Sequence, residues 1–127
     1  MTPVVAPFPL TRLRRTRKST ALRALTRQNT LTVHDLIWPV FVMDGTDASY
    51  DIPSMPGVKR LTVDRLVAAA RDAAALGIPA ICIFPYTDPA LKTDCCSEAW
   101  NPDNLSNRAI RAIKDAVPEI AVMTDVA

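Results

Sequence analysis

The chain alternates between short apolar runs and longer stretches with helical periodicity. Three runs are continuously apolar and predict strands, at 36–42, 80–84 and 120–124. The first run is rich in β-branched and aromatic residues, and Pro39 within it argues against a helix. Continuous runs of this kind are typical of strands that are buried on both faces, as in a parallel sheet. We therefore predict three buried parallel strands.

Two stretches between these strands have apolar residues at helical spacing. The first begins at Thr62 or Asp64 and ends before Gly77, which suits the residue after a helix. The second runs over about 103–117, and Pro118 ends it. The long connections at 43–61 and 85–102 are predicted as loops, and their length suggests a functional or interface role.

The order strand, helix, strand, helix, strand implies right-handed parallel crossovers with helices covering the sheet. The strand centres lie roughly 40 residues apart, so eight such units would need about 320 residues, within the range of a (β/α)8 barrel. We therefore expect an α/β fold in which residues 35–127 form the first three βα-type units of an incomplete TIM barrel. We expect the chain to be the N-terminal portion of a larger barrel enzyme.

Composition changes this picture little. The chain has 127 residues, 49% hydrophobic and 22% charged, which is close to the average for soluble globular proteins. No apolar stretch approaches the ~20 residues that span a bilayer, and the Pro-rich start lacks the features of a secretion signal. The three cysteines do not form the even framework of a secreted disulfide-rich protein. We expect a cytoplasmic protein that does not bind a membrane.

Charge is distributed unevenly along the chain. Residues 1–34, the basic arm, carry seven basic side chains and no acidic one, whereas 35–127 has eight basic and thirteen acidic groups. Within the arm, Ser19 is a plausible N-cap for a short helix to about Gln28. The arm could bind nucleic acid, act as a transit peptide, or dock on the acidic body of a neighbouring subunit. It has no interleaved aromatic residues for base stacking, so we favour a homo-oligomer contact and no nucleic-acid partner.

Candidate catalytic groups are few. Asp125 follows the third predicted strand, and working residues of parallel α/β folds lie at the carboxyl ends of strands. A carboxylate there could orient an amine, act as a general base or bind a metal, although it could equally cap the strand end. The four lysines lie in the arm, in loops or on a helix, where a solvated role is favoured over Schiff-base chemistry; they are Lys18, Lys59, Lys92 and Lys114.

The cysteines and the histidine do not form a recognisable metal or redox motif. Cys95 and Cys96 are adjacent rather than spaced as C-x-x-C, and no histidine is near them. Cys82 alternates with isoleucines in the second strand, which favours core packing. His34 precedes the first strand, so we expect it near the stability face of a barrel rather than the catalytic face.

Several stretches together resemble the porphobilinogen synthase family, also called 5-aminolevulinate dehydratase. The most specific part is the apolar strand followed, at its spacing, by Ser-Met-Pro-Gly-Val. The stretches are RLRR at 12–15, DLIWPVFV at 35–42, IPSMPGV at 52–58, SEAWN at 97–101 and TDVA at 124–127.

The resemblance implies a lyase of tetrapyrrole and haem biosynthesis, built on a (β/α)8 barrel with an N-terminal arm that wraps around a neighbouring subunit. Such an enzyme condenses two molecules of 5-aminolevulinate into porphobilinogen through Schiff bases on two lysines, which the family places beyond residue 127. It implies that Asp125 lies near an aminolevulinate amine. Zinc-dependent members have a cysteine where this chain has Ala127, so a catalytic zinc is not expected, while magnesium or metal independence stays open.

A self-contained receiver-like or partner-binding α/β domain is the alternative. A receiver domain also has an aspartate at the end of its third strand, and its length would fit. It requires an acidic pair after the first strand, where this chain has the single carboxylate of Asp44.

Overall fold

The computed structural model describes residues 6–125 of the chain. These residues divide into two compact units, with the division between Leu31 and Thr32. Within the described residues, no helix has both the length and the apolar character needed to cross a membrane.

The N-terminal unit contains two short helical elements, η1 (Arg15–Arg17) and α1 (Thr20–Leu25). The predicted N-cap is confirmed, because the Ser19 hydroxyl accepts a hydrogen bond from the Leu22 N–H at 3.2 Å. The helix ends earlier than predicted, at Leu25 rather than near Gln28, since Thr26 leaves the helical conformation and its hydroxyl donates to the Leu22 carbonyl. Neither element buries a residue within its own unit.

The second unit is built on a five-stranded sheet of order β2-β3-β1-β4-β5. Its members are β1 (Ile37–Met43), β2 (Ser49–Asp51), β3 (Lys59–Thr62), β4 (Ala80–Pro85) and β5 (Ala121–Thr124). The three predicted strands are confirmed as β1, β4 and β5, and they pair in parallel as neighbours. A 3-10 turn, η2 (Val33–Asp35), precedes β1 and carries His34 at the amino end of the sheet, as expected.

The prediction of a plain loop at 43–61 is wrong. This segment contains β2 and β3, which pair antiparallel with each other, while β3 pairs in parallel with the carboxyl half of β1. Both strands are short and mostly polar, so they have no apolar alternation that would distinguish them from a loop. The hairpin is fixed instead by its pairing with β1, together with Thr62, whose buried hydroxyl bonds both backbone groups of Ala48.

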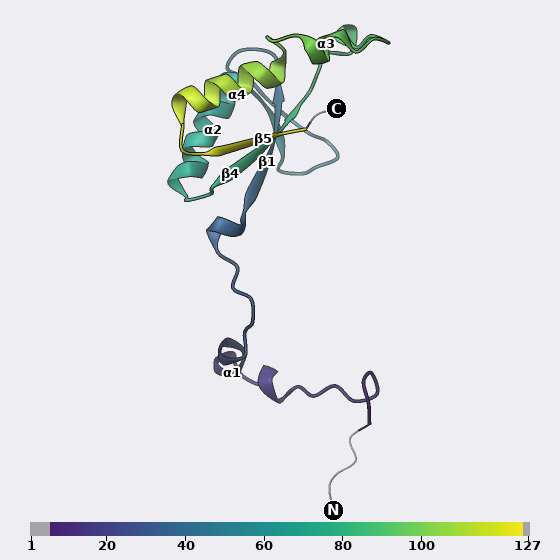
Figure 1. Cartoon of the computed structure of the whole chain (residues 1–127), viewed down its shortest axis with the longest axis vertical. Coiled ribbons are helices and arrows are strands. Elements are labelled where there is room, and N and C mark those ends of the chain that lie inside the picture. Colours follow the sequence, from purple (N-terminus) through teal and green to yellow (C-terminus); the bar gives the residue numbers. More distant parts are fainter. Residues whose placement is uncertain (1–5, 126–127) are drawn as a thin grey trace, which may run out of the picture. The chain divides into compact units, whose positions relative to one another are not determined.

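Two helices cover one face of the sheet, α2 (Val63–Ala75) and α4 (Leu105–Ala116), as Figure 1 shows. Both were predicted from their periodicity. Their apolar stripes and alternate residues of the strands form a single core. Its largest fully buried apolar side chains are Leu66, Ile81, Ile83, Ile113, Ile120 and Val42.

The expectation that the strands are buried on both faces is not met by the described residues. Side chains alternate along the strands, so Ile81 and Ile83 enter the core while Cys82 and Phe84 are only half-buried. Cys82, predicted as a core residue, therefore lies on the face opposite α2 and α4. The runs read as continuous in sequence because this second face is also apolar.

The predicted loop at 85–102 contains two short helical elements, η3 (Pro89–Leu91) and α3 (Ser97–Trp100). Cys96 precedes α3 in the left-handed conformation, with φ of 51°. The segment connects β4 to α4 and carries most of the side chains described next.

Candidate active site

A cavity of about 650 Å³ lies at the carboxyl ends of β4 and β5. This is the edge of a parallel sheet where functional residues are expected. Its walls come from the ends of the two strands, the 86–104 segment and the first turn of α4. The lining residues are Pro85, Thr87, Leu91, Lys92, Thr93, Cys96, Glu98, Ala99, Asn104, Leu105, Ser106, Asn107, Thr124 and Asp125.

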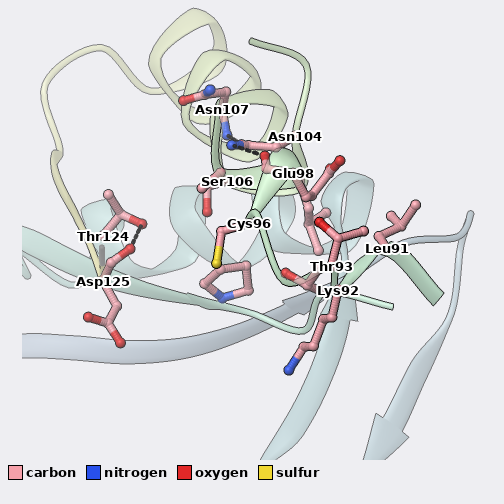
Figure 2. A pocket seen from close by; sticks show the side chains of 14 residues that line it. Leu91, Lys92, Thr93, Cys96, Glu98, Asn104, Ser106, Asn107, Thr124 and Asp125 are labelled. Atoms are coloured by element: carbon pink, nitrogen blue, oxygen red, sulfur yellow. Dashed lines mark hydrogen bonds between the residues drawn. The ribbon is translucent and has the colours of Figure 1, made fainter. Parts of the chain in front are cut away.

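Asp125 lines this cavity immediately after β5, at the place predicted from the sequence. Its N–H donates to the Ile83 carbonyl at 3.5 Å, and the Thr124 hydroxyl donates to its carbonyl oxygen at 3.1 Å. The carboxylate is exposed, and Figure 2 shows it pointing away from Asn104 and Asn107 of the α4 turn. The sheet therefore holds the backbone of Asp125, and none of the ion pairs among residues 6–125 includes its carboxylate.

A network of amide side chains shapes the wall formed by the start of α4. Asn104 caps this helix, accepting from the Asn107 N–H at 2.8 Å, and its own amide donates to the Glu98 carbonyl at 3.4 Å. The Asn101 amide donates to the Glu98 carboxylate at 3.2 Å, and the Asn107 amide donates to the Asn101 carbonyl at 3.4 Å. These bonds tie α3 to α4. The sequence marked Glu98 and Asn101 only as part of the family-like stretch 97–101 and did not point to Asn104 or Asn107, although their place after β4 was a usable signal.

The opposite side of the cavity is formed by the loop after η3. Figure 2 shows Thr124 and Asp125 on one side and Lys92 and Thr93 on the other, with Cys96 between them. Lys92 is exposed, in keeping with the solvated role favoured from the sequence, but it also lines the cavity.

The adjacent cysteines differ in their surroundings. The Thr93 hydroxyl lies 3.4 Å from the Cys95 sulfur, and this hydrogen bond lowers the pKa of the Cys95 thiol below its ordinary value. Cys96 lines the cavity instead. Both thiols are free and exposed.

Comparison with known proteins decides the family. The family model for delta-aminolevulinic acid dehydratase matches residues 10–127. The chain belongs to the delta-aminolevulinic acid dehydratase family. The resemblance seen in the sequence is thereby confirmed.

Two bacterial members of the family align over most of the chain. It is 50% identical to the delta-aminolevulinic acid dehydratase of Rhodobacter capsulatus, covering 100% of this chain and 38% of that protein. It is 53% identical to that of Bradyrhizobium diazoefficiens, covering 91% of this chain and 33% of the relative. The chain therefore spans about a third of the length of these relatives.

A solved member of the family supports the fold assignment. The crystal structure of delta-aminolevulinic acid dehydratase from Toxoplasma gondii, in complex with the reaction product porphobilinogen, superposes with a TM-score of 0.84 at 42% identity. The match covers 92% of this chain and 33% of that one. The described sheet and helices thus form part of a TIM barrel, as predicted, and the receiver-like alternative is excluded.

The described residues do not form a recognisable metal-binding site. Within 6–125, no cluster of three or more His, Cys, Asp or Glu side chains is arranged to hold a metal ion. Ala127, on which the expectation about zinc depends, lies outside the described residues. The expectations about zinc and magnesium stay predictions.

Proposed function

We propose that this chain is part of an enzyme that condenses two molecules of 5-aminolevulinate to porphobilinogen with loss of water, a step of tetrapyrrole and haem biosynthesis. The observation that carries the proposal is the likeness to the Toxoplasma gondii enzyme, which was solved with its product porphobilinogen. With a TM-score of 0.84 and 42% identity, the two proteins agree in both backbone and sequence over nearly the whole of this chain. The cavity at the carboxyl ends of β4 and β5 lies where a TIM barrel places its chemistry.

Asp125 is the catalytic residue that the chain contributes. Its exposed carboxylate at the end of β5 would hold the ammonium group of one aminolevulinate and orient it for ring closure. A fixed carboxylate also stabilises positive charge on the amine, and this effect strengthens as water leaves the site. The bond from the Asp125 N–H to the Ile83 carbonyl holds the backbone from which the carboxylate projects.

The remaining chemistry comes from outside these residues. Schiff-base formation needs two lysines with depressed basicity in a pocket, and the family resemblance places them beyond residue 127. A protein of these 127 residues alone is therefore expected to be inactive, even if it folds.

The basic arm is proposed to dock on a neighbouring copy of the chain in a cytoplasmic homo-oligomer. Residues 1–34 carry a charge of +7 and residues 35–127 a charge of −5, so arm and body are complementary. The arm also exposes large apolar side chains that its own unit does not bury, namely Leu10, Leu13, Leu25 and Leu31. A contact that is both apolar and basic suits an acidic protein surface better than it suits nucleic acid.

The experiment is a porphobilinogen assay on the full natural protein, on Asp125→Asn and on Asp125→Ala. We expect the natural protein to form porphobilinogen from 5-aminolevulinate. Both variants should lose about 100-fold or more in kcat, the scale measured when one fixed electrostatic group is removed from an active site. Asp115→Asn is the matched control, because Asp115 is an exposed aspartate on α4 that lines no cavity wall.

The possible outcomes test the proposed function and the role of Asp125 separately. Absence of porphobilinogen with the natural protein would refute the proposed function. Formation of porphobilinogen at an unchanged rate by Asp125→Asn would leave the function standing and refute the role of Asp125.

A further inference from the structure

A row of four side chains crosses the face of the sheet that lies opposite α2 and α4. Arg60 of β3 pairs in register with Phe41 of β1, and Phe41 pairs with Phe84 of β4. The register between β4 and β5 ends with Ile83 opposite Thr124, and extending it by one residue places Asp125 opposite Phe84, beside the backbone bond from the Asp125 N–H to the Ile83 carbonyl. Partners in a parallel register point to the same face of a sheet. The row therefore has a guanidinium at one end, two aromatic rings in the middle and a carboxylate at the other end.

The middle of the row is a continuous apolar floor. The rings of Phe41 and Phe84 have centroids 5.6 Å apart and are tilted by 34°. Both residues are half-buried, whereas their neighbours Val40, Val42 and Ile83 point into the core on the other face. A ligand lying along the row would contact this floor between the two charged ends.

Arg60 is oriented by an aromatic ring but has no anionic partner among residues 6–125. Its guanidinium carbon lies 4.3 Å from the centroid of the Tyr86 ring. Tyr86 itself is held directly after β4 by a 2.7 Å bond from its N–H to the Val42 carbonyl. The four ion pairs formed by the described residues do not include Arg60. Stacking fixes the plane of the guanidinium and leaves the N–H donors at its edge available for a carboxylate.

The length of the row matches two substrate molecules. The backbones of Arg60 and Asp125 are three strand spacings apart in the sheet order β3-β1-β4-β5, or about 14 Å at ~4.8 Å per strand. An extended chain covers about 3.6 Å for every three bonds, so the six bonds from the amine nitrogen to a carboxylate oxygen of 5-aminolevulinate span about 7 Å. Two such molecules placed one after the other are therefore about as long as the separation of these two backbone positions.

We propose that Arg60 is a substrate-binding residue that donates hydrogen bonds to a carboxylate of the substrate pair, at the end of the row opposite Asp125. The inference rests on the proposed function and extends it to a residue on β3. The ligand class is an aliphatic carboxylate, and Tyr86 is a positioning residue that holds the guanidinium in place.

The test compares Arg60→Gln and Arg60→Lys with the natural full-length enzyme. Loss of a charge-assisted bond to a carboxylate raises KM for 5-aminolevulinate by about 10- to 100-fold in Arg60→Gln. Arg60→Lys shows a smaller rise, because an ammonium keeps the charge but not the two-pronged geometry. Lys59→Gln is the matched control: Lys59 lies next to Arg60 on β3, is exposed, pairs with Asp51 at 3.6 Å and alternates to the other face. Its KM stays within about twofold of the natural value, as for a surface ion pair.

A second substrate distinguishes binding from a merely structural role. The methyl ester of 5-aminolevulinate lacks the negative charge, so the natural enzyme prefers the acid and Arg60→Gln loses that preference. An equal loss with acid and ester, or an unchanged KM in Arg60→Gln, would overturn the inference while leaving the proposed function intact. If Arg60→Gln does not fold, the acid-to-ester preference of Arg60→Lys decides in the same way. A natural enzyme that forms no porphobilinogen would overturn both proposals.

Discussion

Replacing Thr62 by Val tests whether a single buried hydroxyl holds the β2–β3 hairpin, which carries Arg60, onto the sheet. Thr62 is fully buried, and its side-chain oxygen accepts from the Ala48 N–H and donates to the Ala48 carbonyl, both at 3.1 Å. Valine has the same shape but cannot form either bond. In the variant, the Ala48 carbonyl still accepts a hydrogen bond from the Thr62 N–H. The Ala48 N–H, in contrast, loses its acceptor, the Thr62 hydroxyl.

The expected cost follows from that one lost partner. A buried donor left without an acceptor costs about 1 to 3 kcal/mol, and Ala48 is half-buried, so we expect about 1 to 2 kcal/mol. This corresponds to a factor of about 5 to 30 in the opening equilibrium of the hairpin. Local opening governs the exchange of backbone amides with solvent.

Hydrogen exchange of the full natural protein, followed by mass spectrometry, measures this change. Peptides covering 47–51 and 59–62 should exchange about 5 to 30 times faster in Thr62→Val, while peptides from α4 should be unaffected. Thr46→Val is the control, because Thr46 is an exposed threonine in the same connection. Equal exchange of the hairpin in Thr62→Val and the natural protein would refute the reasoning.

Two further predictions concern titratable groups. Hydrogen bonds from the Thr32 N–H at 2.7 Å and the Thr32 hydroxyl at 2.9 Å lower the pKa of Asp35 below its ordinary value of 3.8. Because the folded pKa is depressed, this stabilisation is present above pH 3.8 and is lost as the pH falls through the lowered value. The midpoint of thermal unfolding, followed from pH 6 downward, should therefore depend less on pH in Asp35→Asn than in Asp115→Asn. Equal pH dependence of the midpoint in the two variants would contradict this prediction. The second prediction is that Thr93→Val raises the pKa of Cys95 and slows its alkylation by iodoacetamide near neutral pH, whereas Thr93→Ser keeps the natural rate. Peptide mass spectrometry measures the rates, and equal rates in the Val and Ser variants would show that the hydroxyl has no such effect.

The elements that the sequence predicted well are those with a strong local pattern. Helix α2 has a clear apolar stripe and ends before Gly77, whose φ of 81° is one that glycine adopts readily. The strands β1, β4 and β5 are apolar runs bounded by turn residues, and Asp125 follows directly from the end of β5. Such patterns depend on neighbours within one turn or one strand, so they can be read without knowing the fold.

The elements that were missed depend on contacts between distant residues. The strands β2 and β3 are three and four residues long and largely polar, and they exist because β3 pairs with β1 and Thr62 bonds Ala48. The cavity wall made by Glu98, Asn101 and Asn104 likewise depends on the docking of α3 against the start of α4. Neither the hairpin nor this network has a local period that a sequence could display.

Patterns in the sequence were enough to predict the α/β class, the order of the main elements, the family resemblance and the position of Asp125 at a strand end. These follow from hydrophobic periodicity, turn residues and motifs, which are properties of short segments. The row on one face that contains Arg60, Phe41, Phe84 and, one residue beyond the last paired position, Asp125 becomes visible only once the strands are paired. Register between strands is set by pairing across the sheet and by packing of the opposite face, and a shift of one residue would send Arg60 to the other side.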